Sequence, residues 1–291
     1  MYDNLILLFT IVDDFCQLFI PWWNKHLLES GLKKRHKPCR LSISEIMALF
    51  IYFHQLRFRD FKTYYTQYVQ PHLAHLFPGL VSYNRFVELL KSAFVPLCFF
   101  VQSFAGQKTG IYFIDSTMIK VCHIKREKQH KVFKGLAQKS KSSTGWFFGF
   151  KLHLVINDKG ELMAFKVTAA NVDDREPVPD LVKNLVGKLI GDRGYISQPL
   201  FEELYQKGLQ LVTRIRKNMK NKLMLLADKI LLRKRAIIES VNDQLKNISQ
   251  VEHTRHRSVF NFAVNILAAL AAYVLQPKKP SLNLNSEILV A

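Results

Sequence analysis

The hydrophobic pattern of this chain changes period near residue 105, and that change limits the folds open to it. Residues 1–105 carry apolar side chains at helical spacing, as at Ile46, Phe50 and Phe53. Residues 110–120, GIYFIDSTMIK, are instead rich in β-branched and aromatic residues, which predicts a buried strand. The sequence therefore predicts a helical N-terminal region followed by a region built around a sheet.

Four further strands are predicted after the first one. Residues 146–157 and 161–168 form a hairpin around the turn at 158–160, Asp-Lys-Gly. Short strands are expected at 188–191 and 209–215, between segments with helical patterns. The helices expected between and after these strands span residues 177–186, 198–207 and about 223–277.

The order of these elements predicts the fold class. Three leading strands, followed by two strands interleaved with helices, suit a mixed sheet covered by helices. This is also the element order of the ribonuclease-H-like fold. We therefore expect an α/β protein with a ribonuclease-H-like mixed five-stranded sheet flanked by helices, preceded by an all-helical N-terminal domain. The predicted boundaries are 1–105 for the helical domain, 106–276 for the sheet domain and 277–291 for a flexible tail.

A large excess of basic charge indicates a polyanionic partner. The chain has 42 Lys and Arg against 23 Asp and Glu, a formal net charge of +19. Residues 120–141 hold eight basic residues and one acid, and residues 207–235 hold ten and one. Such runs are often plain solvated surface, but two runs that flank one candidate site favour a track for a phosphate backbone. Lys139 and Lys141 are candidate DNA contacts in the first run.

Neither a membrane span nor a disulfide framework is expected. The most apolar stretch, Phe260–Leu275, contains Asn261 and Asn265 and is shorter than the ~20 residues that cross a bilayer, so it predicts a buried helix. The four cysteines form no C-x-x-C pair, which fits reduced thiols. We therefore expect a cytosolic protein with no membrane partner.

Acids are scarce in this chain, so the positions of two aspartates are informative. Asp115 lies inside the first apolar strand, where a carboxylate is unfavourable unless it is paired or binds a metal. Asp192 follows the fourth strand, at the carboxyl end where α/β sheets place their sites. If these strands are neighbours, the two carboxylates face each other, and a divalent cation is their natural partner. The alternatives are a locally satisfied buried Asp and ordinary Gly-Asp turn chemistry.

Glu239 supplies a third carboxylate on a predicted helix. Arg235, Asn242 and Lys246 fall within the same stripe of that helix, about 100° wide, and are candidate DNA contacts. Taken alone, this pattern is equally typical of an exposed Arg–Glu pair. Beside the two aspartates it indicates a metal site next to a bound phosphodiester. Three carboxylates suit Mg²⁺ or Mn²⁺, and two such ions can serve an in-line displacement at phosphorus.

Several other residues are candidates for a role in binding or in supporting the site, on weaker sequence patterns. Arg255 and Arg257 precede a helix that Ser258 would cap, a favourable place for phosphate contact. His153 and Asp174 could support the site indirectly, although a lone strand histidine is more often structural. Asp173 and Asp174 are expected to cap the helix near residue 177. Trp146 is expected in the core, and the alternative is that it stacks on a base. In the N-terminal helices the candidate DNA contacts are Arg57, Arg59, Lys62, Asn84 and Arg85. The alternative is that these helices mainly mediate dimerisation.

These residues resemble a known family. Asp115, Asp192 and Glu239, in this order of elements, look like the catalytic triad of the DDE transposases of bacterial insertion sequences, and specifically of insertion sequence family 982. In many relatives a tyrosine stands where this chain has Leu232, before an Arg, Glu and Lys that match Arg235, Glu239 and Lys246 here. The stretches that carry the resemblance are FIDST, KSSTGWFFGFKLH, TAANVDDRE, GDRGYIS, RKNMKN, LLRKRAIIESVNDQLKN and EHTRHRSVFNF, within residues 110–275.

The resemblance implies a polynucleotidyl transferase that cuts and rejoins DNA at the terminal inverted repeats of its element. Asp115, Asp192 and Glu239 would be both catalytic and metal-binding, with two Mg²⁺ or Mn²⁺ ions per site. Double-stranded DNA, as terminal repeats and as target, would be the partner. A homodimer on DNA is expected because two ends must be brought together. The setting would be the bacterial cytosol, on the nucleoid when the protein is bound to DNA.

Two other functions remain open. A ribonuclease-H-like DNA nuclease without strand transfer would share the three carboxylates, but would need neither end-specific binding nor a DNA 3′-hydroxyl. A non-catalytic DNA-binding remnant or regulator predicts the loss of at least one carboxylate, whereas all three are present.

Overall fold

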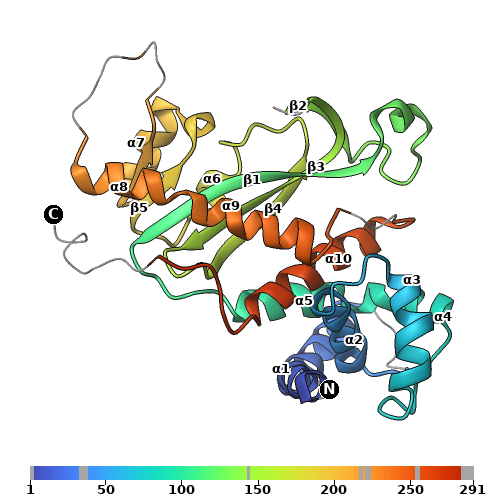
Figure 1. Ribbon diagram of the computed structural model, residues 1–291. Coiled ribbons are helices and arrows are strands. Elements are labelled where there is room, and N and C mark those ends of the chain that lie inside the picture. The colour runs from blue at the N-terminus through green and yellow to red at the C-terminus, as the bar shows by residue number, and fades with distance from the viewer. Residues whose placement is uncertain are drawn as a thin grey trace. The chain divides into compact units, whose positions relative to one another are not determined.

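The computed structural model describes residues 3–32, 39–142, 145–215, 219, 224–252 and 256–282. The chain forms two compact units, and neither is a single stretch of sequence (Figure 1). Unit 1 comprises Met1–Phe104 and Leu245–Leu275. Unit 2 comprises Ala105–Gln244 and Gln276–Ala291. The chain therefore passes from one unit to the other three times.

Unit 1 takes up residues 245–275, which the sequence assigns to the sheet domain. Residues 245–275 join the N-terminal helices because α10 (Val259–Val274) is apolar on all sides, with twelve of its 16 residues buried. A helix of that kind needs packing around its whole circumference, which a bundle supplies. The expected tail begins in unit 2, where the Leu282 amide donates to the Asp158 carbonyl at 2.8 Å. Residues 283–291 lie outside the described part of the chain.

Unit 1 is helical in all the residues that the structure assigns to regular elements, as predicted. Ser42 and Glu45 form a capping box at the start of α2 (Ile43–Gln55), and Ser82 caps α4 (Tyr83–Leu89). The elements are α1 (Asp3–Glu29), α2 (Ile43–Gln55), α3 (Phe61–Tyr64), the π-helical segment η1 (Tyr65–Leu73), α4 (Tyr83–Leu89), the 3₁₀ turn η2 (Leu90–Ala93), α5 (Phe94–Ser103) and α10.

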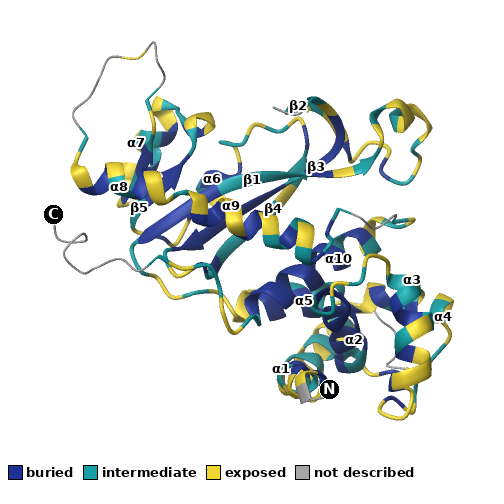
Figure 2. Cartoon of the chain, viewed as in Figure 1, coloured by how far each residue is buried: buried dark blue, intermediate teal, exposed yellow. Residues whose placement is uncertain are grey.

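The core of unit 1 is built around α2 and α10, which appear almost wholly dark blue in Figure 2. Ten of the 13 residues of α2 are buried. α10 packs against α2 and α5, and α1 covers α2. The buried His54 of α2 bonds the Ser249 carbonyl through Nδ1 at 2.7 Å, which ties the segment before α10 to the bundle. The predicted buried helix at 260–275 is therefore confirmed.

Two other segments of unit 1 are long and apolar enough to cross a membrane by length and composition. They are Asn4–Glu29, with 28% of its most apolar window buried in the protein, and Tyr83–Ser103, with 39%. The second is divided among α4, η2 and α5. Core helices of soluble proteins pass the same test, so the expected absence of a membrane partner stays a prediction.

Unit 2 contains a six-stranded mixed sheet. Five of the strands lie in the order β4-β3-β1-β5-β6. β4 is antiparallel to β3 and β3 to β1, whereas β5 is parallel to β1 and β6 to β5. This topology confirms the predicted ribonuclease-H-like class. The strands are β1 (Ile111–Cys122), β2 (Gln138–Ser142), β3 (Gly145–Asn157), β4 (Leu162–Ala169), β5 (Gly187–Gly191) and β6 (Leu209–Thr213).

The sixth strand, β2, is absent from the sequence prediction because its residues, QKSKS, contain no apolar side chain. It pairs with the first part of β3, from Gly145 to Gly149, and β4 pairs with the remainder of the same edge. Backbone pairing with a long neighbour holds this strand, without burial of its side chains.

Alternation along β1 assigns its residues to two faces of the sheet. Tyr112 and Ile114 belong to a buried cluster with residues of α6 (Val178–Leu181) and α7 (Gln198–Gln206). Phe113 and Asp115 therefore point to the opposite face. On that face lie α8 (Leu226–Lys234), which contacts β5 and β6, and α9 (Ala236–Asp243), which contacts β1. The remaining turns of unit 2 are η3 (Ile124–Gln129) and η4 (Arg193–Tyr195), and the π-helical η5 (Gln244–Ile248) contains the boundary between the two units.

An ion pair fastens α8 to β5. Lys188 Nζ lies 2.6 Å from Asp228 Oδ1, and the Asp228 side chain is 6% exposed whereas that of Lys188 is 28% exposed. The aspartate is thus the more deeply buried partner, and it depends on the lysine for compensation of its charge.

We predict an asymmetry between the two members of this pair. Lys188→Met leaves a buried, unpaired carboxylate and should lower the free energy of unfolding by about 3–5 kcal/mol. Asp228→Asn leaves an ammonium that can turn to solvent and should lower it by about 1 kcal/mol. Urea denaturation followed by circular dichroism measures both, and equal losses would contradict this account.

Candidate active site

Parallel pairing of β1 with β5 places two aspartates at the same level of the sheet. Phe113 lies opposite Ile190 in this register. Asp115 and Asp192 each follow two residues later, so they continue the same register beyond the last paired residues. The predicted adjacency of the two strands is therefore confirmed, and the two carboxylates come from neighbouring strands.

Asp115 occupies a largely dry position. Its side chain is 20% exposed, Asn242 Nδ2 donates to its Oδ2 at 2.9 Å, and Arg235 lies 3.7 Å from its Oδ1. Burial raises the pKa of Asp115 to about 6, the Arg235 guanidinium opposes that rise, and the carboxylates of Asp192 and Glu239 add to it. The three carboxylates therefore share one electrostatic environment.

Asp192 is held in a tight turn at the end of β5. Its Oδ1 accepts a hydrogen bond from the Gly194 amide at 2.8 Å, which caps η4. Tyr195 packs beneath this turn, where a Cβ atom on Gly191 would lie 3.0 Å from the tyrosine ring. Burial raises the pKa of Tyr195 well above its usual value, and nearby carboxylates, Asp115 first among them, add to that rise. A neutral phenol thus supports the aspartate turn from below.

Glu239 is the most exposed of the three acids. Its side chain is 56% exposed on α9, and its Oε1 accepts from the guanidinium of Arg235 one helical turn earlier. Arg235 lies between the end of α8 and the start of α9 and pairs with both Glu239 and Asp115. The exposed Arg–Glu pair that the sequence leaves open is thus present, and it extends to the buried aspartate.

A cavity of about 490 Å³ opens beside these residues. Two of its lining residues, Asp192 and Glu239, are acids, and four are arginines. Leu232, at the position where relatives carry tyrosine, is buried and also lines it. The arginines are Arg193, Arg214, Arg233 and Arg235.

The donor chemistry of the three carboxylates fits a hard divalent cation, because Mg²⁺ and Mn²⁺ prefer carboxylate oxygens. Burial is the main cause of the raised pKa of Asp115, and the nearby Asp192 and Glu239 carboxylates add to it, so a cation bound between these groups would favour the charged form of Asp115. In the part of the chain that is described, no three His, Cys, Asp or Glu residues are grouped to hold a metal ion. Arg235 neutralises Asp115 and Glu239 in this arrangement, so it must release them before all three could act as ligands.

The two predicted contacts in the first basic run lie on β2 and are exposed. Lys139 stands over the ring of Trp146, 5.3 Å from its centre, and its Nζ lies 3.7 Å from Glu127. Trp146 is 57% exposed, so its expected place in the core is wrong. Position 146 lies where β2 pairs with β3, at the edge of the sheet, and the aromatic face is covered by a lysine instead of core residues. Lys141 is exposed two residues beyond Lys139.

His153 and Asp174 lie near the carboxylates without touching them. His153 is buried on β3 opposite Ser116, and its Nε2 bonds Thr168 Oγ1 at 2.8 Å. Burial lowers the pKa of His153 to about 4, and the Asp174 carboxylate opposes this shift. Asp174 pairs with Lys151 at 2.9 Å. A neutral structural histidine is the best account of this arrangement.

The expected aspartate cap near residue 177 is wrong. Pro177 is the N-cap residue of α6 and makes no side-chain cap bond, and Asp173 instead accepts hydrogen bonds from the Arg175 side chain and amide. Arg175 is only two residues from Asp173, and the local ion pair between them occupies the carboxylate that a helix cap would need.

The remaining predicted DNA contacts belong to unit 1 or lie outside the described residues. Lys246 Nζ lies 3.5 Å from Glu252, Arg257 is exposed before α10, and Arg255 is not described. Ser258 caps α10 as predicted. Among the N-terminal candidates, Arg57 adopts a positive φ of 60° after α2, Arg85 pairs with Glu88, and Arg59, Lys62 and Asn84 are exposed.

Comparison with known proteins gives the family. Residues 105–259, more than half of the chain, match the family described as "Transposase DDE domain". The chain belongs to that family. This assignment confirms the coarse resemblance read from the sequence, that of a DDE transposase.

Two further comparisons complete these findings. No curated protein matches the sequence. Among solved structures, the chain is similar to the piggyBac transposase in a synaptic complex with hairpin DNA, at 11% identity and a TM-score of 0.47, over 94% of this chain and 75% of that one.

Some features of the candidate site in this transposase-family chain are not predicted by the sequence pattern. Arg193 and Arg214 reach the cavity from η4 and from just beyond β6. Asn242, predicted as a DNA contact, instead bonds Asp115 and is buried. Its spacing from Glu239 indicates a shared helix face, but the partner on β1 is 127 residues away in sequence.

We predict that Asp115 destabilises the metal-free fold at neutral pH. Its folded pKa of about 6 lies above the ordinary 3.8, so the folded state binds more protons between these values and loses stability as pH rises through them. In EDTA, Asp115→Asn should therefore stabilise the protein by about 2–3 kcal/mol at pH 7.5, with the gain vanishing near pH 4. Thermal melts across that range measure it.

The control for this experiment is Asp180→Asn. Pairing with Lys166 lowers the pKa of that exposed carboxyl, so its loss should bring no gain at pH 7.5. A gain for Asp115→Asn that is constant with pH would overturn the assignment of the titration.

Proposed function

We propose that this chain is the transposase of a bacterial insertion sequence of the family 982 type. It binds the terminal inverted repeats of its element and catalyses metal-dependent strand cleavage and strand transfer. The observation that carries this proposal is that Asp115 lies on β1 and Asp192 directly follows the adjacent parallel strand β5, with Glu239 close enough to perturb Asp115, inside a transposase DDE domain.

Asp115, Asp192 and Glu239 would hold Mg²⁺ or Mn²⁺, two ions in our proposal. Bound there, the cations would activate a water or DNA 3′-hydroxyl and neutralise charge that develops on the phosphate. Asn242 fixes the orientation of Asp115 through its amide. The Gly194 amide does the same for Asp192, leaving the aspartate's other oxygen available.

Arg235 acts as a placeholder in this proposal. It neutralises Glu239 and Asp115 when no other cation is present, and its guanidinium can turn to a phosphate once the carboxylates have another partner. Arg193, Arg214 and Arg233, around the same cavity, are positioned to receive the flanking phosphates. The exposed Lys139 and Lys141 on β2 would extend the backbone track, with Trp146 available to stack on a base.

Unit 1 would supply recognition of the repeats, and the candidate DNA contacts are Arg57, Arg59, Lys62, Asn84 and Arg85. A homodimer on DNA, action in the bacterial cytosol and phosphate contacts by Lys246, Arg255 and Arg257 belong to the same proposal. The net charge of +19 supports a polyanionic partner.

The second candidate, a nuclease without strand transfer, would use the same carboxylates. It differs in one measurable property, because it leaves cut ends unjoined. A non-catalytic remnant would bind the ends without cutting them. An assay of strand cleavage and joining on labelled element ends therefore separates all three.

We predict that Asp192→Asn abolishes cleavage and joining while DNA binding is unchanged or slightly tighter, because a negative charge near phosphate is removed. The assay uses Mg²⁺, Mn²⁺ or EDTA, with binding measured by fluorescence anisotropy. Asp180→Asn, an exposed aspartate on α6, is the matched control and should cut normally. Cleavage retained by Asp192→Asn would refute the triad.

We also predict that Arg233→Ala weakens binding with little dependence on DNA sequence and reduces the slope of log Kd against log salt by about 1. Lys183→Ala, an exposed cation beyond α6 on the other side of the sheet, should leave the slope unchanged. Equal slopes for wild type and Arg233→Ala would remove this arginine from the DNA track.

A further inference from the structure

Unit 1 contains a cavity of about 710 Å³ that the proposed chemistry does not use. Its walls come from α3, α4 and the first turns of α10, so residues far apart in the sequence meet around it. The volume lies within the range of sites that bind small molecules. The lining residues are Phe50, Asp60, Phe61, Lys62, Tyr83, Asn84, Val87, Leu90, His256, Arg257, Asn261 and Asn265.

The floor of this cavity carries an amide without a partner. Asn265 is 1% exposed, and neither its Nδ2 nor its Oδ1 has a hydrogen-bond partner among the described residues. One turn earlier, Asn261 donates to the Val87 carbonyl at 3.3 Å, and its Oδ1 is likewise unsatisfied. An unpaired buried amide is unfavourable by about 1–3 kcal/mol, so the fold retains these groups at a loss of stability.

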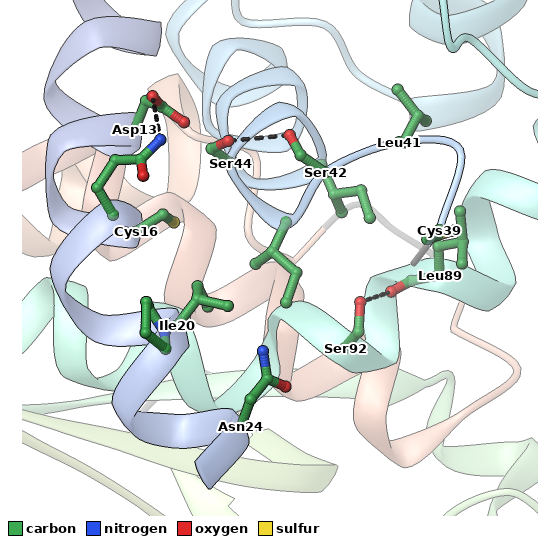
Figure 3. Close-up of a pocket in the computed structure, with 14 residues that line it drawn as sticks. Asp13, Cys16, Ile20, Asn24, Cys39, Leu41, Ser42, Ser44, Leu89 and Ser92 are labelled. Carbon is green, nitrogen blue, oxygen red and sulfur yellow. Dashed lines mark hydrogen bonds between the residues drawn. The ribbon is translucent and has the colours of Figure 1, made fainter. Parts of the chain in front are cut away.

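A second cavity of unit 1 provides the contrast. It measures about 470 Å³ between α1, α2 and α4 and is shown in Figure 3. Its polar side chains are satisfied internally: Ser42 bonds Ser44, Ser92 bonds the Leu89 carbonyl, and Gln17 bonds Asp13. The polar groups of that cavity therefore give no indication of a ligand. In the larger cavity, by contrast, the Asn261 Oδ1 and both polar atoms of the Asn265 amide have no hydrogen-bond partner among the described residues.

The walls of the larger cavity add an aromatic ring and cations. Burial raises the pKa of Tyr83, the Asp60 carboxylate adds to the rise, and the Arg257 guanidinium opposes it. The Tyr83 hydroxyl therefore lies near charges of both signs. Asp60 is already engaged as the cap of α3, where it accepts from the Thr63 amide at 2.9 Å. Lys62 and Arg257 therefore set the charge available to a ligand, and both are exposed.

We propose that this cavity binds one unpaired nucleotide of the DNA held by the protein. The base enters edge first, and the amide of Asn265 makes a donor–acceptor pair with it, as asparagine does with adenine. Tyr83 provides an aromatic face beside the base, and Lys62 and Arg257 bind the flanking phosphates. The proposal rests on the proposed function, because it takes the polyanion to be DNA.

The test uses a short duplex with one unpaired adenine, the same duplex fully paired, and the same duplex with an abasic residue in place of the adenine. Wild type should bind the unpaired adenine about tenfold more tightly than either control, by fluorescence anisotropy. Asn265→Leu should lose this preference and keep its affinity for paired DNA. Its Tm should rise by about 2–4 °C, since an unsatisfied buried amide becomes apolar.

Asn4→Leu, an exposed amide on α1, is the matched control and should keep the preference. Asn261→Leu, at a half-buried position, is a second variant with the same expected loss of preference. Equal affinity of wild type for the three duplexes, or a preference retained in both variants, overturns the nucleotide site. Absence of binding to every duplex overturns the proposed function as well, so the two failures are distinguishable.

Discussion

Pairing of β1 with strands on both of its edges is the constraint on which the candidate site depends. β3 runs antiparallel along one edge from Tyr112 to Cys122, and β5 runs parallel along the other. Asp115 therefore belongs to a backbone that cannot shift without breaking the sheet. A carboxylate fixed in this way cannot relieve its desolvation by moving to water, so its neighbours must relieve it. Asn242 and Arg235 do so in this structure.

The three acids differ in how firmly the fold holds them. Asp115 is part of a strand, and Asp192 is held by a turn amide directly after one. Glu239 is exposed on a helix and is held by a flexible arginine. The sheet thus supplies two fixed oxygen donors, and the helix supplies one that can adjust. This arrangement suits chemistry in which the substrate changes shape between successive steps at one site.

Sequence reasoning finds the features that depend on local pattern. The strands at 110–120, 146–157 and 161–168 agree with the structure within a few residues, and so does the cap at Ser258. It fails where a tertiary partner decides. β2 has no apolar signal, Trp146 is covered by Lys139, and Asp173 takes a neighbouring arginine in place of a helix end. Unused hydrogen-bonding groups at Asn265 are invisible in a sequence, since they are defined by what surrounds them.

The return of α10 to the N-terminal bundle has a consequence for synthesis of the protein. Ten residues of α2 are buried in the finished unit, partly against α10. A ribosome makes α2 some 200 residues before it makes α10. The first unit thus waits, with its central helix incompletely covered, while the sheet emerges and folds. Unit 1 is the first unit to be started, and it is completed only after the last helix, α10, has been translated.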